Sequence, residues 1–273
     1  LRAGGVVVAA NPMFKEEELK YELMDAGARI IIAQDFLYPK VRNVREEAGL
    51  SHVILTSYRD YLPASPSLPL HPSMQAPKER YPETLDLLEV MDGQQPEPIN
   101  IPTNLREDLA LLQYTSGTTG LPKGAMITHF SLITNTVGSA VWNGVLEQDI
   151  VLSVLPFFHV TGMIHSMCRP VYTGTTNIML ARFEPEAVLQ AIHKYRCTLW
   201  GSITTMNVAT VNHPDVEKYD LRSLRVCGSG GAPVPKEILE KWRKIIGTEL
   251  AEGYGLSETI SQTHMNPYRR PRY

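Results

Sequence analysis

Short apolar runs alternate with helix-like segments through residues 5–60, and this alternation limits the folds that the chain can adopt. The strand-like runs cover residues 6–10, 29–33 and 52–56, and the helix-like segments cover residues 16–26 and 35–48. Strands and helices that alternate in this way indicate βαβ units and a mostly parallel sheet. Three consecutive isoleucines at residues 30–32 predict that their strand is buried on both faces.

A proline-rich stretch interrupts the pattern at residues 61–102, which hold nine prolines. We expect a long surface connection there, with one short helix near residues 85–91. The alternation then resumes, with strands at residues 150–155, 177–180, 198–200 and 224–227 and helices at residues 128–141, 184–192 and 235–245. The sequence therefore predicts an α/β fold that is rich in βαβ units, with mostly parallel sheets and flanking helices.

A segment rich in glycines and hydroxyl side chains, residues 114–124, follows an apolar run that has the character of a buried strand's end. Glycines let backbone N–H groups approach phosphate oxygens, hydroxyls add short donors, and Lys123 adds a positive charge. Such a loop can wrap a polyphosphate. Its spacing differs from G-x-x-x-x-G-K-[ST], and residues 228–233 differ from G-x-G-x-x-G, so neither common nucleotide motif accounts for it.

Three further segments lie where a parallel sheet places its ligands, at the carboxyl ends of predicted strands. They are residues 156–162, 228–233 and 252–259. From the residues alone, His159 is better explained as a core or helix-start histidine than as a ligand, and glycine-rich turns are common. Tyr254 offers an aromatic face to a base, and Glu258 offers an oxygen ligand suited to Mg²⁺.

The run Tyr-Thr-Ser-Gly-Thr-Thr-Gly-Leu-Pro-Lys-Gly at residues 114–124 resembles the signature of adenylate-forming enzymes, the AMP-binding superfamily of acyl-CoA synthetases, luciferases and peptide-synthetase adenylation domains. The other three segments strengthen the resemblance, and residues 212–225 are most similar to fatty-acid-CoA ligases. The resemblance implies an acid–thiol ligase of lipid metabolism. Such an enzyme activates a fatty acid with ATP to an acyl-adenylate and then forms a thioester with coenzyme A.

The resemblance also assigns roles to individual residues. The expected catalytic residues are Lys123, His159 near the substrate carboxylate, and Glu258, which is also the expected Mg²⁺ ligand. The expected triphosphate contacts are Thr115, Ser116, Gly117, Thr118, Thr119, Gly120 and Lys123. The other expected nucleotide contacts are Gly231, Ala232, Pro233, Gly253, Tyr254, Gly255, Ser257 and Thr259.

Two departures from the family pattern limit these expectations. Family members continue past the Glu258 region to an aspartate, a hinge arginine and a mobile C-terminal domain with a catalytic lysine. We therefore expect residues 1–273 to be the central portion of the N-terminal adenylation domain, incomplete at both ends, and inactive alone. A Val-Pro-Pro turn common in relatives is missing near residues 203–205, which leaves the acyl chain length open. Trp200, Met206 and Met163 are candidates for the acyl pocket, and core packing explains them equally well.

Several alternatives stay open at this point. An aryl-acid-CoA ligase and a luciferase-like oxygenase share the same motifs. A peptide-synthetase domain would need an aspartate near residues 200–205 to hold the substrate amine, and none is there. A further alternative is not an enzyme at all but a non-catalytic nucleotide-binding fragment.

Charge and cysteine content set limits on location and partners. The formal net charge is −3, which argues against a nucleic-acid partner. The three cysteines are widely spaced, which suits a reducing compartment and gives no zinc-site spacing. No run approaches the roughly 20 apolar residues of a membrane span. We expect a cytoplasmic protein, and we leave open both peripheral membrane attachment and a homodimer.

Overall fold

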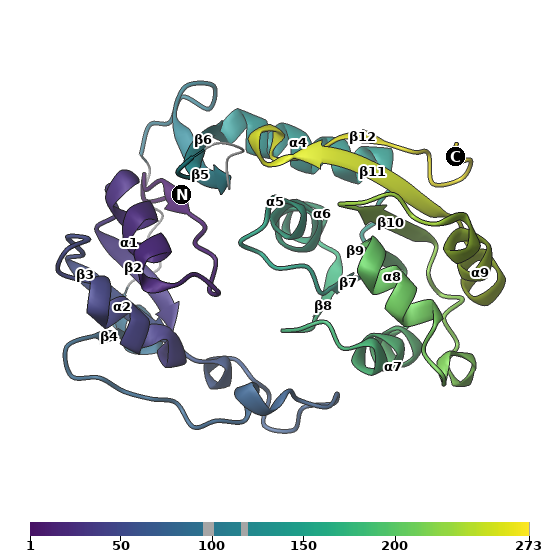
Figure 1. Cartoon of the computed structure of the whole chain (residues 1–273), viewed down its shortest axis with the longest axis horizontal. Coiled ribbons are helices and arrows are strands. Elements are labelled where there is room, and N and C mark those ends of the chain that lie inside the picture. The colour runs from purple at the N-terminus through teal and green to yellow at the C-terminus, as the bar shows by residue number, and fades with distance from the viewer. Residues whose placement is uncertain (95–100, 116–119, 273) are drawn as a thin grey trace. The chain divides into compact units, whose positions relative to one another are not determined.

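The computed structural model describes residues 1–94, 101–115 and 120–272. The chain divides into two compact units. The first unit comprises Leu1–Asn104 and Leu109–Met126, and the second comprises Leu105–Asp108 and Ile127–Tyr273. Figure 1 traces the chain from its purple N-terminus to its yellow C-terminus.

Two three-stranded sheets form the first unit. One has the order β2-β3-β4 with all strands parallel, and the other has the order β1-β5-β6 with β1 parallel to β5. The strands are β1 (Val7–Val8), β2 (Ile30–Gln34), β3 (His52–Thr56), β4 (Leu85–Asp86), β5 (Leu109–Thr115) and β6 (Lys123–Thr128). The helices are α1 (Glu16–Asp25), α2 (Tyr38–Val44) and α3 (Leu87–Asp92). The short helix expected in the proline-rich stretch is therefore confirmed as α3.

The expectation that residues 30–32 are buried on both faces is wrong. Ile30 and Ile32 are 56% and 60% exposed, whereas Ile31 packs against the core. The core of this unit joins α1 and α2 to one face of β2 and β3, and the side chains of a strand alternate between faces. Only every second residue of β2 therefore reaches the helices.

A six-stranded sheet forms the centre of the second unit, in the order β12-β11-β10-β9-β7-β8. All neighbours pair in parallel except β11 and β12, which are antiparallel. The strands are β7 (Ile150–Ser153), β8 (Thr176–Met179), β9 (Leu199–Ile203), β10 (Val226–Gly230), β11 (Leu250–Leu256) and β12 (Ser261–Met265). The predicted α/β class with mostly parallel sheets is confirmed.

Helices flank this sheet on both sides (Figure 1). One group is α7 (Pro185–Tyr195), α8 (Thr204–Val211) and α9 (Lys236–Ile246), and the other is α4 (His129–Trp142), α5 (Val160–Gly162), a π-helical segment (Met163–Cys168) and α6 (Arg169–Thr173). As expected, Thr128 caps α4, because its hydroxyl accepts a hydrogen bond from the Ser131 N–H. Among the described residues, no helix has the length and apolar content that a membrane crossing requires.

Candidate active site

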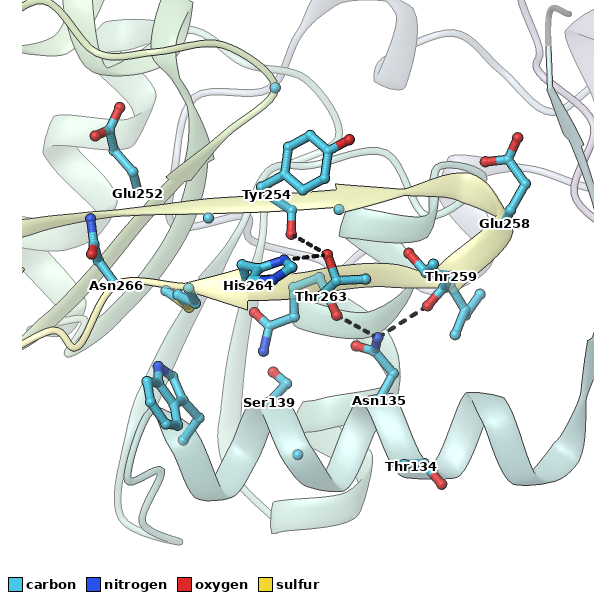
Figure 2. A pocket seen from close by; sticks show the side chains of 18 of the residues that line it. Thr134, Asn135, Ser139, Glu252, Tyr254, Glu258, Thr259, Thr263, His264 and Asn266 are labelled. Carbon is cyan, nitrogen blue, oxygen red and sulfur yellow. Dashed lines mark hydrogen bonds between the residues drawn. The ribbon is translucent and has the colours of Figure 1, made fainter. Parts of the chain in front are cut away.

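A cavity of about 1390 Å³ lies in the second unit, beside the β11–β12 hairpin and α4. Its wall combines the loop after β10, both strands of the hairpin, and one side of α4 (Figure 2). It brings together eight of the predicted site residues: Gly231, Ala232, Pro233, Gly253, Tyr254, Gly255, Glu258 and Thr259. Segments separated by about a hundred residues in sequence thus converge where the resemblance expects the nucleotide.

The loop after β10 is held on two sides by side chains. The Thr204 hydroxyl donates to the Ala232 carbonyl at 2.7 Å, and the Val234 N–H donates to Glu252 Oε1 at 2.8 Å. Gly231 has a φ of 82°, a left-handed conformation that glycine adopts without steric cost. The resulting turn forms part of the cavity wall.

Buried hydrogen bonds beneath this loop tie β9 and β10 to α8. Asn207 donates to the Ser202 hydroxyl at 2.7 Å and accepts from the Ser229 hydroxyl at 2.7 Å. Ser202 in turn donates to the Gly228 carbonyl at 2.8 Å. Every member of the network has a partner, so it fixes the strand ends that lead to the cavity.

Tyr254 projects from β11 on the side of the hairpin away from α4 (Figure 2). Its side chain is 61% exposed, so one face of the ring can receive a flat heterocycle. The neighbouring Gly255 sits at a break in the β11–β12 register, where a side chain is excluded because its Cβ would lie 1.9 Å from the Ser261 carbonyl oxygen. Gly255 therefore allows the hairpin to close tightly beside Tyr254.

Glu258 and Thr259 lie on the turn between the two hairpin strands. The Glu258 side chain is exposed and makes no hydrogen bond or ion pair with the described residues, so its carboxylate can bind a ligand. The Thr259 hydroxyl already accepts from the Leu256 N–H at 3.1 Å and lies 3.0 Å from the Leu256 and Ser261 carbonyls. The Thr259 hydroxyl proton is therefore donated to a carbonyl of the turn itself. The expected contact of Thr259 with phosphate stays a prediction. Ser257 precedes these residues but does not line the cavity.

Glu258 fits a magnesium ion that keeps most of its water. Within the described ranges, no group of three or more His, Cys, Asp or Glu side chains is arranged to hold a metal. Mg²⁺ in phosphate-transfer sites commonly uses only one or two carboxylates plus substrate phosphates and water. The exposed Glu258 carboxylate in the wall of this cavity is compatible with that pattern.

His159 is exposed and begins α5 as its N-cap. Its Nδ1 accepts a hydrogen bond from the Thr161 N–H at 3.3 Å. Although the residue keeps solvent contact, the protein atoms packed around its ring partly desolvate it, which lowers the pKa of His159 and favours the neutral imidazole at pH 7. The helix-start interpretation of the sequence is thus confirmed, and His159 is absent from the lining of the cavity beside the hairpin.

The loop at residues 114–124 belongs to the first unit. Ser116, Gly117, Thr118 and Thr119 lie outside the described residues. Thr115 ends β5, half-buried, whereas Gly120 and Lys123 are exposed. Lys123 and Glu258 belong to different units, so their joint action on one triphosphate stays a prediction.

Both ends of this loop are tied to one face of α1. The Tyr114 hydroxyl donates to Asp25 Oδ2 at 2.6 Å, and the Tyr21 hydroxyl donates to the Pro122 carbonyl at 2.9 Å. Tyr21 and Asp25 are four residues apart and therefore share a helix face. Gly124 passes beside the Tyr114 ring, where an added Cβ would come within 3.2 Å of ring carbon.

The three candidates for the acyl pocket are buried. Trp200 is 1% exposed and packs against Trp242 with ring centroids 5.7 Å apart, and Met163 and Met206 are 5% and 8% exposed. None of them lines the cavity beside the hairpin. For Trp200, core packing is the observed role.

Sequence reasoning missed several residues that shape the site. Thr204 lies in the segment that lacks the Val-Pro-Pro turn, and Glu252 lies beside the residues singled out on β11. Asn135 on α4 was also missed, and it contacts the turn that bears Glu258. A row of polar residues on one side of α4 is the signal that could have found it.

Comparison with known proteins identifies the family of the chain. The family model described as AMP-binding enzyme matches residues 1–273, so the chain belongs to the AMP-binding enzyme family. It is 37% identical to a long-chain-fatty-acid–CoA ligase of Bacillus subtilis, over 97% of this chain and 49% of that protein. It is 30% identical to 4-coumarate–CoA ligase 3 of Arabidopsis thaliana, over 93% of this chain and 42% of that protein.

The solved structures give the same result for the fold. A long-chain-fatty-acid-CoA ligase from Archaeoglobus fulgidus superposes with a TM-score of 0.79 at 28% identity, covering 97% of this chain and 50% of that one. The chain thus spans about half the length of these two curated relatives and of this solved structure.

Proposed function

We propose that the whole protein carrying this chain is an AMP-forming acid–thiol ligase that activates a fatty acid with ATP and transfers it to coenzyme A. In this proposal residues 1–273 form part of its nucleotide-binding domain. The observation that carries the proposal is the cavity beside the hairpin, whose wall includes an exposed aromatic ring, a glycine turn and an exposed carboxylate. The long-chain-fatty-acid–CoA ligases among the relatives support the choice of a fatty acid.

The proposed reaction has two steps. In the first, a carboxylate oxygen of the acid attacks the α-phosphorus of ATP, the bond to the β-phosphate oxygen breaks, and pyrophosphate leaves. In the second, the thiolate of coenzyme A attacks the acyl carbon, and AMP leaves with the electron pair of the broken acyl–oxygen bond. Both steps depend mainly on positioning and on neutralising negative charge.

The residues of this chain would divide that work. The backbone of Gly231–Pro233 and the ring of Tyr254 would bind the adenine, and Thr115–Lys123 would bind the phosphates with Lys123 supplying charge. Glu258 would hold Mg²⁺, which supplies charge neutralisation on the triphosphate when bound. His159, kept neutral by desolvation, would orient the substrate carboxylate through a hydrogen bond.

The 4-coumarate–CoA ligase relative favours one alternative, an aryl acid as the substrate. A luciferase-like oxygenase and a non-catalytic nucleotide-binding protein remain further alternatives, without an observation that favours them. We also propose a cytoplasmic location, and the homodimer stays a prediction.

The test is acid-dependent exchange of labelled pyrophosphate into ATP, measured on the whole protein with acids from acetate to long-chain and aryl acids. We expect exchange that requires an acid and Mg²⁺ and that is fastest with fatty acids. Fastest exchange with an aryl acid would replace the substrate class. ATP binding without exchange for any acid would contradict the proposed activity.

A further inference from the structure

The turn that bears Glu258 has an unusual backbone conformation. Ile260 has a φ of 50° and Ser261 a φ of 101°, and both side chains are buried, at 2% and 4% exposure. Residues other than glycine seldom adopt positive φ, least of all β-branched ones. Such strain persists only where the surrounding structure holds it, and it is concentrated at functional sites.

One side chain on α4 holds both ends of this strained pair. Asn135 Nδ2 donates to the Thr259 carbonyl at 3.2 Å and to the Gln262 carbonyl at 2.9 Å (Figure 2). These carbonyls belong to the residues immediately before and after Ile260 and Ser261. A side-chain amide has two N–H donors, so both donors of Asn135 are used and neither is left for a ligand.

A second contact reaches the same pair from the helices. The Ser261 hydroxyl lies 3.5 Å from His165 Nε2, and His165 Nδ1 lies 3.2 Å from the hydroxyl of Ser139. Ser139 is one helical turn after Asn135 on α4. The Asn135 amide therefore bonds the backbone on either side of the strained pair, while His165 contacts the side chain of Ser261.

We propose that Asn135 is a positioning residue, whose amide keeps the strained Ile260–Ser261 backbone in place and thereby sets the position of the Glu258 carboxylate for metal-bound ATP. Glu258 lies two residues before the strained pair, so relaxation of that backbone would displace it. The part of this inference that concerns the metal rests on the proposed function of Glu258. The mechanical part rests only on the two hydrogen bonds and the backbone angles.

The test compares Asn135→Asp with Thr136→Val in the whole protein. Asn135→Asp keeps the size of the side chain but replaces its donors with an oxygen that repels both carbonyls. Thr136→Val is the matched control, because it removes a buried hydrogen bond from the next residue, Thr136 to the Leu132 carbonyl at 2.8 Å, within α4. Asn135→Ser, with a single hydroxyl donor, serves as a milder second variant.

Two measurements are made on each variant. Hydrogen–deuterium exchange is followed in peptides covering residues 256–262 and, for comparison, residues 226–230. The Kd for ATP is measured by calorimetry with Mg²⁺ and again with EDTA. We expect Asn135→Asp to speed exchange only in residues 256–262 and to weaken binding of Mg²⁺-ATP about tenfold, with less than about a twofold change in EDTA. Asn135→Ser should lie between, and Thr136→Val should match the parent in both measurements.

Unchanged exchange at residues 256–262 in both Asn135 variants would overturn the proposal. Faster exchange there without a magnesium-specific loss of ATP affinity would overturn its link to Glu258, as would a parent protein that binds no Mg²⁺-ATP. A parent that binds Mg²⁺-ATP but shows no acid-dependent pyrophosphate exchange would reject the proposed ligase activity alone, because neither measurement depends on turnover.

Discussion

The loop after β5 and the turn after β11 are both predicted to meet the triphosphate, but they are held in different ways. The loop is fixed at its two ends, where Tyr21 and Asp25 of α1 bond residues that flank it. The turn is fixed at its centre, where Asn135 bonds the carbonyls around a strained backbone pair.

The two segments differ in how many residues hold them. Two hydrogen bonds from two residues of α1 hold the loop, so the loss of one bond leaves the other in place. On the turn, one amide makes the bonds on both sides of the strained pair, so the loss of Asn135 removes both bonds at once. We therefore expect the loop to tolerate anchor mutations better than the turn.

The largest effect should come from the charge that the loop carries. We expect Lys123→Ala to slow adenylate formation about 100-fold, because it removes a cation from a site where negative charge develops. Pyrophosphate exchange at saturating acid measures this. Lys236→Ala is the control, since Lys236 is an exposed lysine on α9. Equal activity of the two variants would show that the loop does not act on the phosphates.

The next prediction concerns how the stability of the second unit depends on pH. Burial and the nearby Arg169 lower the pKa of His165 in the second unit from 6.5 to about 3. The unfolded chain therefore binds the proton more readily, and the contribution of His165 to the free energy of unfolding should fall as pH drops below 6.5, by about 1.4 kcal/mol per pH unit. In urea unfolding, the parent protein should therefore lose about 2 kcal/mol relative to His165→Gln between pH 6.5 and 5. A loss of the same size in that variant would mean that His165 is not the group involved.

The first unit should show the opposite pH dependence. Desolvation raises the pKa of Glu22 on α1 from 4.5 to about 7, so its stabilising contribution is present below pH 4.5 and is lost as pH rises towards 7. Glu22→Gln should therefore be more stable than the parent at pH 8 by about 1 kcal/mol and no more stable at pH 4.5. Urea unfolding of both proteins at the two pH values checks this, and a pH-independent difference would contradict it.

A comparable effect should come from the carboxylate on the turn. We expect Glu258→Gln to raise the Mg²⁺ concentration for half-maximal pyrophosphate exchange about tenfold, because a neutral amide is a weaker ligand for a hard cation. Glu252→Gln is the contrast, since Glu252 accepts from the Val234 N–H near the expected adenine site. It should raise the KM for ATP without changing the Mg²⁺ requirement. The same Mg²⁺ shift in both variants would leave Glu258 without a specific role.

The smallest effect should come from one anchor of the loop. Tyr114→Phe removes the hydrogen bond to Asp25 but leaves the bond between Tyr21 and Pro122. We expect the KM for ATP to rise about threefold with little change in kcat. Tyr114→Phe combined with Tyr21→Phe should exceed the product of the single effects, because the double variant loses both anchors. A loss as large as that of Lys123→Ala would refute shared anchoring.

The sequence was sufficient to predict the fold class and the part of the cavity wall that comes from the loop after β10 and from β11 with its following turn. Apolar runs located β2 and β3, and the residue pattern located the helices α4, α7 and α9, because the buried parts of these elements leave apolar residues in the sequence. The glycine turn after β10 and the residues of β11 were identified through their motifs.

The elements that were missed lack such a pattern. β12 reads Ser-Gln-Thr-His-Met, a polar edge strand that is held by backbone pairing with β11. Ile30 and Ile32 carried a buried-strand pattern although only one face of β2 is covered. Asn135 was missed because its partners are backbone carbonyls more than a hundred residues away, so that only the polar side of α4 marks it in the sequence.

The central claim is that the loop of the first unit and the turn of the second unit act on one triphosphate. A crystal structure of the whole protein with Mg²⁺ and a non-hydrolysable ATP analogue tests it most directly. We predict phosphate oxygens within about 3 Å of the Lys123 ammonium and, in the same molecule, a metal ion on the phosphates that is bound by Glu258. A nucleotide whose phosphates contact only one of these two residues, with the other directed into solvent, would contradict the account.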